Sequence, residues 1–154
     1  MNTPCMKIKN RFRIFPFIVL GLVLIPTNSC KKEENIPKID YGTLIDIDGN
    51  SYKTVKIGTQ EWIAENLRTT QYNDATAIPL VTNNTEWSEL ITSAYCWYNN
   101  DATSLKATYG ALYNWHAVNT NKLCPTGWHV PTEVEWVVLM DYLKDDGSKL
   151  KEAG

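Results

Sequence analysis

The sequence predicts an α+β domain, and three stretches support this prediction. Alternating apolar and polar residues flank a turn between residues 44 and 57, which indicates a β-hairpin. A compact aromatic segment at residues 94–98 is typical of a strand. One capped helix with an apolar face is predicted near residues 132–144. Together these stretches describe short strands, long connections and one main helix.

The first predicted element is the hairpin. Residues 44–47 alternate in polarity, residues 48–50 read Asp-Gly-Asn, a sequence suited to a tight turn, and residues 52–57 alternate again. After a second turn, residues 61–67 form a short strand or extended segment with Trp62 as its apolar anchor. The sequence therefore predicts two paired strands followed by a third extended segment.

The middle of the chain has weaker patterns. Residues 68–93 are rich in Asn, Asp and Thr, which predicts a long structured loop with one helical turn near residues 85–90. The aromatic strand at residues 94–98 follows. Residues 110–115 fit another strand, and residues 116–118 fit the start of a helical turn, although periodicity alone does not decide between them.

The helix near the C-terminal end has the clearest local pattern. Thr132 is placed to cap its N-terminus, and Glu135 stands three residues later, as in a capping box. The helix should end near residues 145–147, which read Asp-Asp-Gly. Its apolar face is predicted to consist of residues at helical spacing, namely Trp136, Leu139, Met140 and Leu143.

Residues 1–29 have the composition of a signal peptide. Four basic residues and no acidic one precede an almost unbroken apolar run at residues 14–26. That run has roughly 13 residues, whereas a membrane-spanning helix needs about 20. We therefore expect export and removal of this segment rather than a permanent transmembrane helix.

Cys30 comes shortly after that run, directly behind the small residue Ser29, and resembles the lipidated cysteine of bacterial lipoproteins, although Thr27 stands where their recognition sequence usually has Leu. Acyl chains on Cys30 would anchor the mature chain to a membrane, and simple secretion is the alternative. Residues 30–40 then form a tether whose Lys-Lys-Glu-Glu run resembles an outer-membrane surface signal, and the domain is expected over residues 41–154. The predicted location is the outer membrane, on the cell surface.

The charge of the mature chain argues against nucleic acid as a partner. Removing the four basic residues of the predicted signal peptide from 15 leaves 11 basic against 17 acidic groups, a balance of −6. No basic stripe of the kind that neutralises phosphates is present in the sequence.

Five segments together resemble the Fibrobacter succinogenes major paralogous domain, which occurs on secreted proteins and surface lipoproteins of Fibrobacter and Bacteroidetes-type bacteria. They are residues 48–58, 62–67, 94–101, 109–115 and 124–132. The resemblance implies an irregular C-type lectin-like fold with short antiparallel strands and long loops. It also implies that the domain is incomplete here, since family members usually continue into a further half that ends in a cysteine-bearing strand.

A second resemblance concerns the start of the predicted helix. Residues 130–136 are similar to the same region of formylglycine-generating enzymes, whose catalytic cysteines lie in a part that this chain lacks. No catalytic residue is therefore carried over by this resemblance.

Two pairings are open for the cysteines after Cys30. One is a bond between Cys96 and Cys124, which an oxidising compartment permits. Alternatively, the family resemblance implies that Cys124 pairs with the cysteine of the further half and leaves Cys96 as a small buried residue, which is the pairing we favour.

The sequence offers no catalytic or metal site. His116 and His129 have Glu133 and Glu135 near them in sequence, but no nucleophile with a neighbouring base is identifiable, so structural roles are favoured. Closely spaced Cys and His pairs, which zinc sites use, do not occur. We expect a protein that is not an enzyme and has no cofactor.

Tryptophan is the remaining candidate for function. Five tryptophans are candidates for packing in the core or for stacking on sugars, with Trp97 and Trp115 the leading ligand-binding candidates; the five are Trp62, Trp87, Trp97, Trp115 and Trp128. The predicted function is display of a non-catalytic binding or adhesion module, for carbohydrate or another protein. The alternatives are an enzyme-like domain related to formylglycine-generating enzymes and a truncated product without function.

Overall fold

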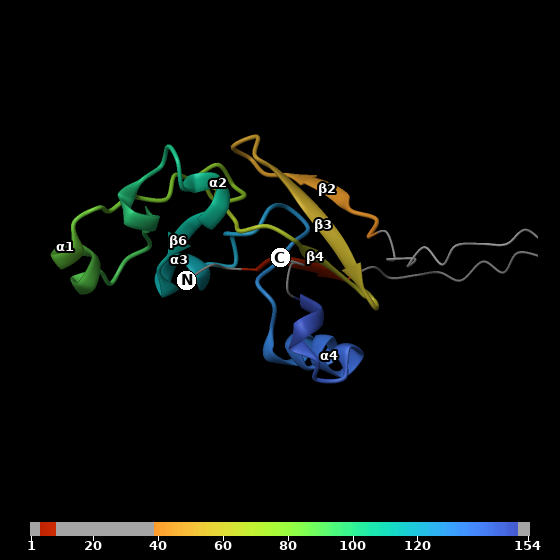
Figure 1. Ribbon diagram of the computed structural model, residues 1–154. Helices are drawn as coiled ribbons and strands as arrows, with labels where there is room; N and C mark the ends of the chain where they lie inside the picture. Colours follow the sequence, from red (N-terminus) through yellow and green to blue (C-terminus); the bar gives the residue numbers. More distant parts are fainter. Residues whose placement is uncertain (1–3, 9–38, 151–154) are drawn as a thin grey trace, which may run out of the picture.

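The computed structural model describes residues 4–8 and 39–150. Within them the chain forms a main antiparallel sheet of four strands, in the spatial order β1, β4, β3, β2 (Figure 1). These strands are β1 (Met6–Ile8), β2 (Gly42–Ile45), β3 (Ser51–Ile57) and β4 (Gln60–Ile63). Because antiparallel strands and helices occupy separate segments, the predicted α+β class is confirmed.

The predicted hairpin is formed by β2 and β3. Leu44 lies opposite Tyr52, and the Asp46 amide donates to the Asn50 carbonyl at 3.0 Å to close the turn. Gly49 has a φ of 80°, a left-handed conformation that glycine adopts without steric cost. The Asp-Gly-Asn sequence therefore makes the turn that it predicts.

A second, smaller layer follows the long loop. It contains an antiparallel pair, β5 (Tyr95–Trp97) and β6 (Ala111–Tyr113), with short helices around it, away from α4 (Figure 1). The predicted aromatic strand and both predicted helical turns are confirmed. The short helices are α1 (Asn84–Glu89), η1 (Tyr98–Asn100), α2 (Lys106–Tyr109) and α3 (Trp115–Val118).

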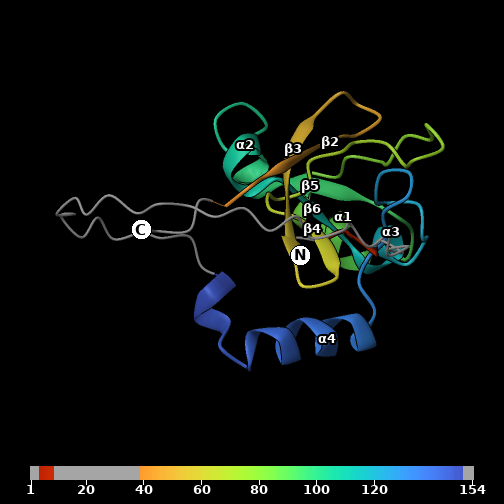
Figure 2. The same cartoon turned by 90° about the vertical axis from the view of Figure 1, so that its right-hand side faces the viewer.

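Helix α4 (Glu133–Leu143) lies across the sheet from that layer, as Figure 2 shows. The capping box is confirmed, because the Thr132 hydroxyl accepts from the Glu135 amide and the Glu135 carboxylate accepts from the Thr132 amide at 2.8 Å. The helix ends where Lys144 turns left-handed with a φ of 57°. A last turn, η2 (Gly147–Leu150), follows.

Successive side chains along a strand point to opposite faces of the sheet. The main sheet therefore contributes residues to a core on each face. Tyr52 on β3 and Ile63 on β4 face a large core shared with β5 and β6. Val55 on β3 and Trp62 on β4 face a smaller cluster with α4. The large core also includes Leu67, Tyr95, Trp97, Tyr113, Leu123 and Trp128.

Strand β1 comes from the segment predicted to be a signal peptide. It pairs with β4, and the preceding Cys5 forms a disulfide with Cys124 across 119 residues of sequence. The folded unit thus includes residues 4–8 as well as the domain expected from residue 41. Cys30 and most of the predicted tether lie outside the described residues.

Candidate functional site

A hollow beside α1 is the best candidate site in the described part of the chain. It encloses about 580 Å³ between α1, β5, η1 and the middle of β6. This size is within the range of small-molecule sites. Its polar lining consists of Thr82, Asn83, Asn84, Asn99 and Asn100, and its apolar lining consists of Val81, Trp87, Cys96, Trp97 and Leu112. We call it the Asn–Trp hollow.

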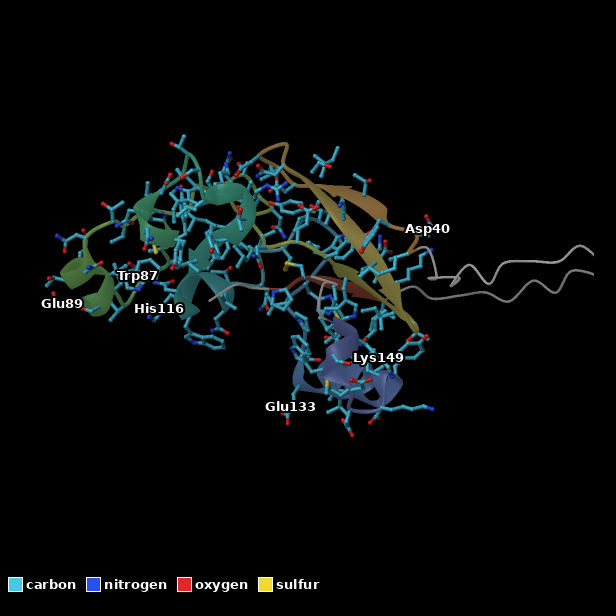
Figure 3. All side chains as sticks on the ribbon, in the orientation of Figure 1. Asp40, Trp87, Glu89, His116, Glu133 and Lys149 are labelled. Carbon is cyan, nitrogen blue, oxygen red and sulfur yellow. A yellow bond between two sulfur atoms is a disulfide. The ribbon has the colours of Figure 1, made fainter. Side chains whose placement is uncertain are left out.

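Helix α1 brings Trp87 to the hollow. The helix begins because the Asn83 side chain caps it, accepting from the Glu86 amide at 3.0 Å. One turn later Trp87 is only partly buried, so its indole retains accessible apolar surface. Figure 3 shows Trp87 at the α1 end of the molecule, far from Glu133 at the start of α4.

The opposite rim is a strained turn. Asn99 and Asn100 both have left-handed backbones, with φ values of 51° and 54°, a conformation that Asn tolerates better than most residues. The Asn100 side chain donates to the Thr82 carbonyl at 3.1 Å and so ties η1 to the α1 segment. The Asn84 and Asn99 side chains are exposed and make no hydrogen bond within residues 4–8 and 39–150. Their amides are therefore available to a ligand.

The lining carries no Asp, Glu, Lys, Arg or His. Cys96 is its one thiol, and burial raises the pKa of that thiol above its usual value. The thiol is therefore protonated at neutral pH and is a poor nucleophile. The hollow is suited to binding an uncharged ligand rather than to proton transfer.

The two tryptophans predicted to bind ligand lie in different environments. Trp97 lines the hollow but is 6% exposed, packed edge-on against Tyr95 with ring centroids 5.3 Å apart. The Lys106 ammonium lies 5.1 Å from the centroid of its ring. Trp115 is 67% exposed on α3 and is not part of the lining. The structure therefore does not bring Trp97 and Trp115 into one site.

Trp87 supplies the accessible indole at this site, although the sequence did not distinguish it from the other tryptophans. The residues around Trp87 in the sequence could have distinguished it. Trp87 follows an Asn-Asn pair in a short capped helix that has no buried residue of its own. An indole on such a helix has little core to join.

A second hollow, near the hairpin turn, has a structural role. It encloses about 260 Å³ and is lined in part by Asp46. The Asp46 carboxylate accepts from the Asn50 amide at 2.8 Å and from the Tyr52 hydroxyl at 2.6 Å. Nearby, Asp48 accepts from the Thr70 hydroxyl at 2.9 Å and from the Gln71 side-chain amide at 2.7 Å. Both carboxylates therefore accept hydrogen bonds that stabilise the hairpin turn.

The predicted cysteine pairing requires correction. Cys96 and Cys124 are not bonded to each other; Cys124 pairs with Cys5, and Cys96 is a partly buried free thiol in β5. The favoured alternative, a partner for Cys124 in a further half of the domain, also differs from this structure. The sequence interpretation considered only cysteines after the predicted cleavage point, so Cys5 was left out.

The histidines and glutamates with catalytic potential lie apart from the hollow. His129 binds Glu135, with Nε2 2.8 Å from Oε1, at the start of α4. Burial alone would raise the pKa of Glu135, but hydrogen bonds from Thr132 and His129 outweigh it and lower that pKa. His116 and Glu133 are exposed. Within the described ranges no three His, Cys, Asp or Glu side chains are grouped to hold a metal ion.

Fold and site together define an α+β domain with an uncharged hollow walled by indoles and amides. The Fibrobacter succinogenes major domain model matches residues 55–154, about two thirds of the chain, and the chain belongs to this family. No curated protein and no solved structure matches the chain significantly. None of the helices that the structure describes has the length and apolar character needed to cross a membrane.

Proposed function

We propose that the chain is a surface lipoprotein, anchored through lipidated Cys30, whose domain binds carbohydrate non-catalytically in the Asn–Trp hollow. The observation that carries this proposal is the partly exposed Trp87 facing a rim of uncharged amides. Sugar rings present C–H faces that pack against indoles and hydroxyls that exchange hydrogen bonds with amides. A hollow without ionisable carboxylates or amines suits such a neutral ligand.

The proposal extends to fold and location. A small antiparallel sheet, long loops and one long helix are consistent with a C-type lectin-like domain. An apolar run of roughly 13 residues follows a basic segment and is itself followed by Ser29-Cys30, which supports export and lipidation. The tether and an acidic domain would then face the medium from the outer membrane.

Carbohydrate binding is tested with the detergent-solubilised chain on glycan arrays and insoluble polysaccharides. Trp87→Ala should weaken binding at least about tenfold, a loss of about 1.4 kcal/mol, because the indole stacking surface is removed. Trp115→Ala is the matched control, since it removes an exposed indole outside the hollow. Binding should change little between pH 5 and 8.

Two results would oppose the carbohydrate proposal. One is the absence of binding to any glycan by a chain whose near-UV circular dichroism shows fixed tryptophans. The other is an equal loss in Trp87→Ala and Trp115→Ala, which would place the binding surface elsewhere.

Lipidation is tested by metabolic labelling with palmitate in a Bacteroidetes-type host. The label should be lost in Cys30→Ser and retained in Cys96→Ser. Protease added to intact cells should degrade the domain if it is displayed at the surface. Palmitate label that persists in Cys30→Ser would contradict the anchor.

A further inference from the structure

Two stacked tyrosines lie beside the Asn–Trp hollow. Tyr98 begins η1 and Tyr109 ends α2, and their rings stack with centroids 4.5 Å apart and an interplanar angle of 27°. The two residues are 42% and 41% exposed, respectively. Each ring covers one face of the other, and the exposed remainder leaves aromatic surface open to a ligand. We call this pair the tyrosine platform.

The backbone holds both tyrosines in place. The Asn66 side chain donates to the Thr108 carbonyl at 3.0 Å and so fixes α2 directly before Tyr109. The Asp101 amide donates to the Tyr98 carbonyl at 3.0 Å and closes η1. Aromatic surface that is already fixed before binding loses little conformational entropy when a ligand contacts it. The platform is therefore suited to contributing affinity.

The platform adjoins the hollow at two points. Tyr98 stands between Trp97 and Asn99 in the chain, and both of these neighbours line the hollow. Consecutive Cα atoms are about 3.8 Å apart, so the platform begins at the rim. In α2, the Lys106 ammonium lies 5.1 Å from the centroid of the Trp97 ring. Both η1 and α2, which carry the platform, thus contact the wall of the hollow.

The hydroxyl groups of the platform have hydrogen-bonding capacity that the fold does not use. Within residues 4–8 and 39–150, neither the Tyr98 hydroxyl nor the Tyr109 hydroxyl makes a hydrogen bond. A tyrosine hydroxyl both donates and accepts. A sugar ring presents a C–H face to an aromatic ring and hydroxyls around its edge, so it matches both parts of these side chains.

Two aromatic surfaces therefore lie on either side of η1, namely the Trp87 indole in the hollow and the tyrosine platform outside it. We propose that the domain binds a polysaccharide chain rather than a single sugar. One sugar unit occupies the hollow against Trp87, and a following unit of the same chain stacks on the tyrosine platform. This inference rests on the proposed function and deepens it by naming an extended glycan as the ligand.

The dependence of affinity on chain length tests this inference. Isothermal titration calorimetry of the detergent-solubilised chain would use neutral oligosaccharides of one to six units from cellulose, xylan, mannan and a β-1,3-glucan. In a series that binds, Kd should fall at least about fivefold between the shortest ligand that binds and one two units longer. Affinity that does not rise with length would overturn the inference and leave the proposed function standing.

A variant of the platform separates its role from that of the hollow. Tyr109→Ala removes one ring of the stack, and Tyr109 is not part of the lining of the hollow. It should weaken the longer ligand at least about fivefold more than the shortest one. Tyr109→Phe keeps the ring and should keep most of the gain with length. Tyr142→Ala, an exposed tyrosine on α4, is the matched control and should bind every length as the unchanged chain does.

The outcomes distinguish this inference from the proposed function. Equal weakening of short and long ligands in Tyr109→Ala would overturn the inference, because the stack would then act only by supporting the fold. Near-UV circular dichroism of the variant checks that the tryptophans stay fixed. Binding that depends on Trp87 but not on Tyr109 would overturn this inference alone. Failure of every oligosaccharide to bind the unchanged chain would overturn both.

Discussion

The two faces of the main sheet are stabilised in different ways. The face toward β5 and β6 packs against a large core drawn mostly from residues 52–128. The face toward α4 has a small cluster in which Met6 joins Trp62, Leu139 and Leu143. The large core is thus built mainly within one continuous stretch, whereas the α4 layer depends on a strand from far away in sequence. Stability of the α4 layer should therefore depend on β1.

The largest expected effect is the loss of the disulfide that ties the β1 segment to the large core. In the intact, oxidised chain, Cys124→Ser should lower the free energy of unfolding by about 4 kcal/mol, because a long loop is no longer closed in the unfolded state. Urea unfolding measures this loss. Cys96→Ser is the control and should cost less than about 1 kcal/mol. Equal losses in the two variants would contradict the link between Cys5 and Cys124.

A cavity in the small cluster should have the next largest effect. Leu139 is 2% exposed beneath Trp62, so Leu139→Ala should cost about 3 kcal/mol through lost burial and an unfilled cavity. Val137→Ala on the same helix is the control, since Val137 is 52% exposed. Thermal unfolding followed by near-UV circular dichroism compares them. A similar loss in both variants would mean that α4 does not pack on the sheet through Leu139.

These contrasts explain which features the sequence could predict. The hairpin turn and the capping box depend on neighbours within a few residues, such as Asp46 with Asn50 and Thr132 with Glu135, and both were predicted. The Cys5–Cys124 bond joins residues 119 apart, one of them in a predicted signal peptide. Local patterns contain no information about such a pairing. The accessible indole of Trp87 was likewise indistinguishable by residue type alone.

A smaller effect is expected at the hairpin, whose Tyr52 belongs to the large core. Asp46 is buried and accepts from Asn50 and from the Tyr52 hydroxyl. Asp46→Asn should cost about 2 kcal/mol, because an amide nitrogen would face donors where an oxygen accepted them. Asp141→Asn, an exposed change on α4, is the control. If urea unfolding gives the same midpoint for both variants, the Asp46 network does not stabilise the turn.

The smallest effect is a pH dependence at the start of α4. Hydrogen bonds from Thr132 and His129 lower the pKa of Glu135 against the opposing effect of burial. A carboxyl group with a lower pKa in the folded state contributes stability above its unfolded pKa, about 4.3, and this contribution is lost as the pH falls through the folded pKa. Glu135→Gln should therefore lose about 1 kcal/mol at pH 7 and lose less relative to wild type at pH 3.

Urea unfolding at the two pH values measures this difference. Glu133→Gln removes a carboxylate from the same helical turn and controls for the general effect of charge near the helix N-terminus. A Glu135→Gln deficit that stays constant from pH 7 to pH 3 would mean that the cap contributes through packing alone. A deficit that disappears at low pH would show that the ionised Glu135 stabilises the start of α4, next to the point where His129 pairs with Met6 of β1.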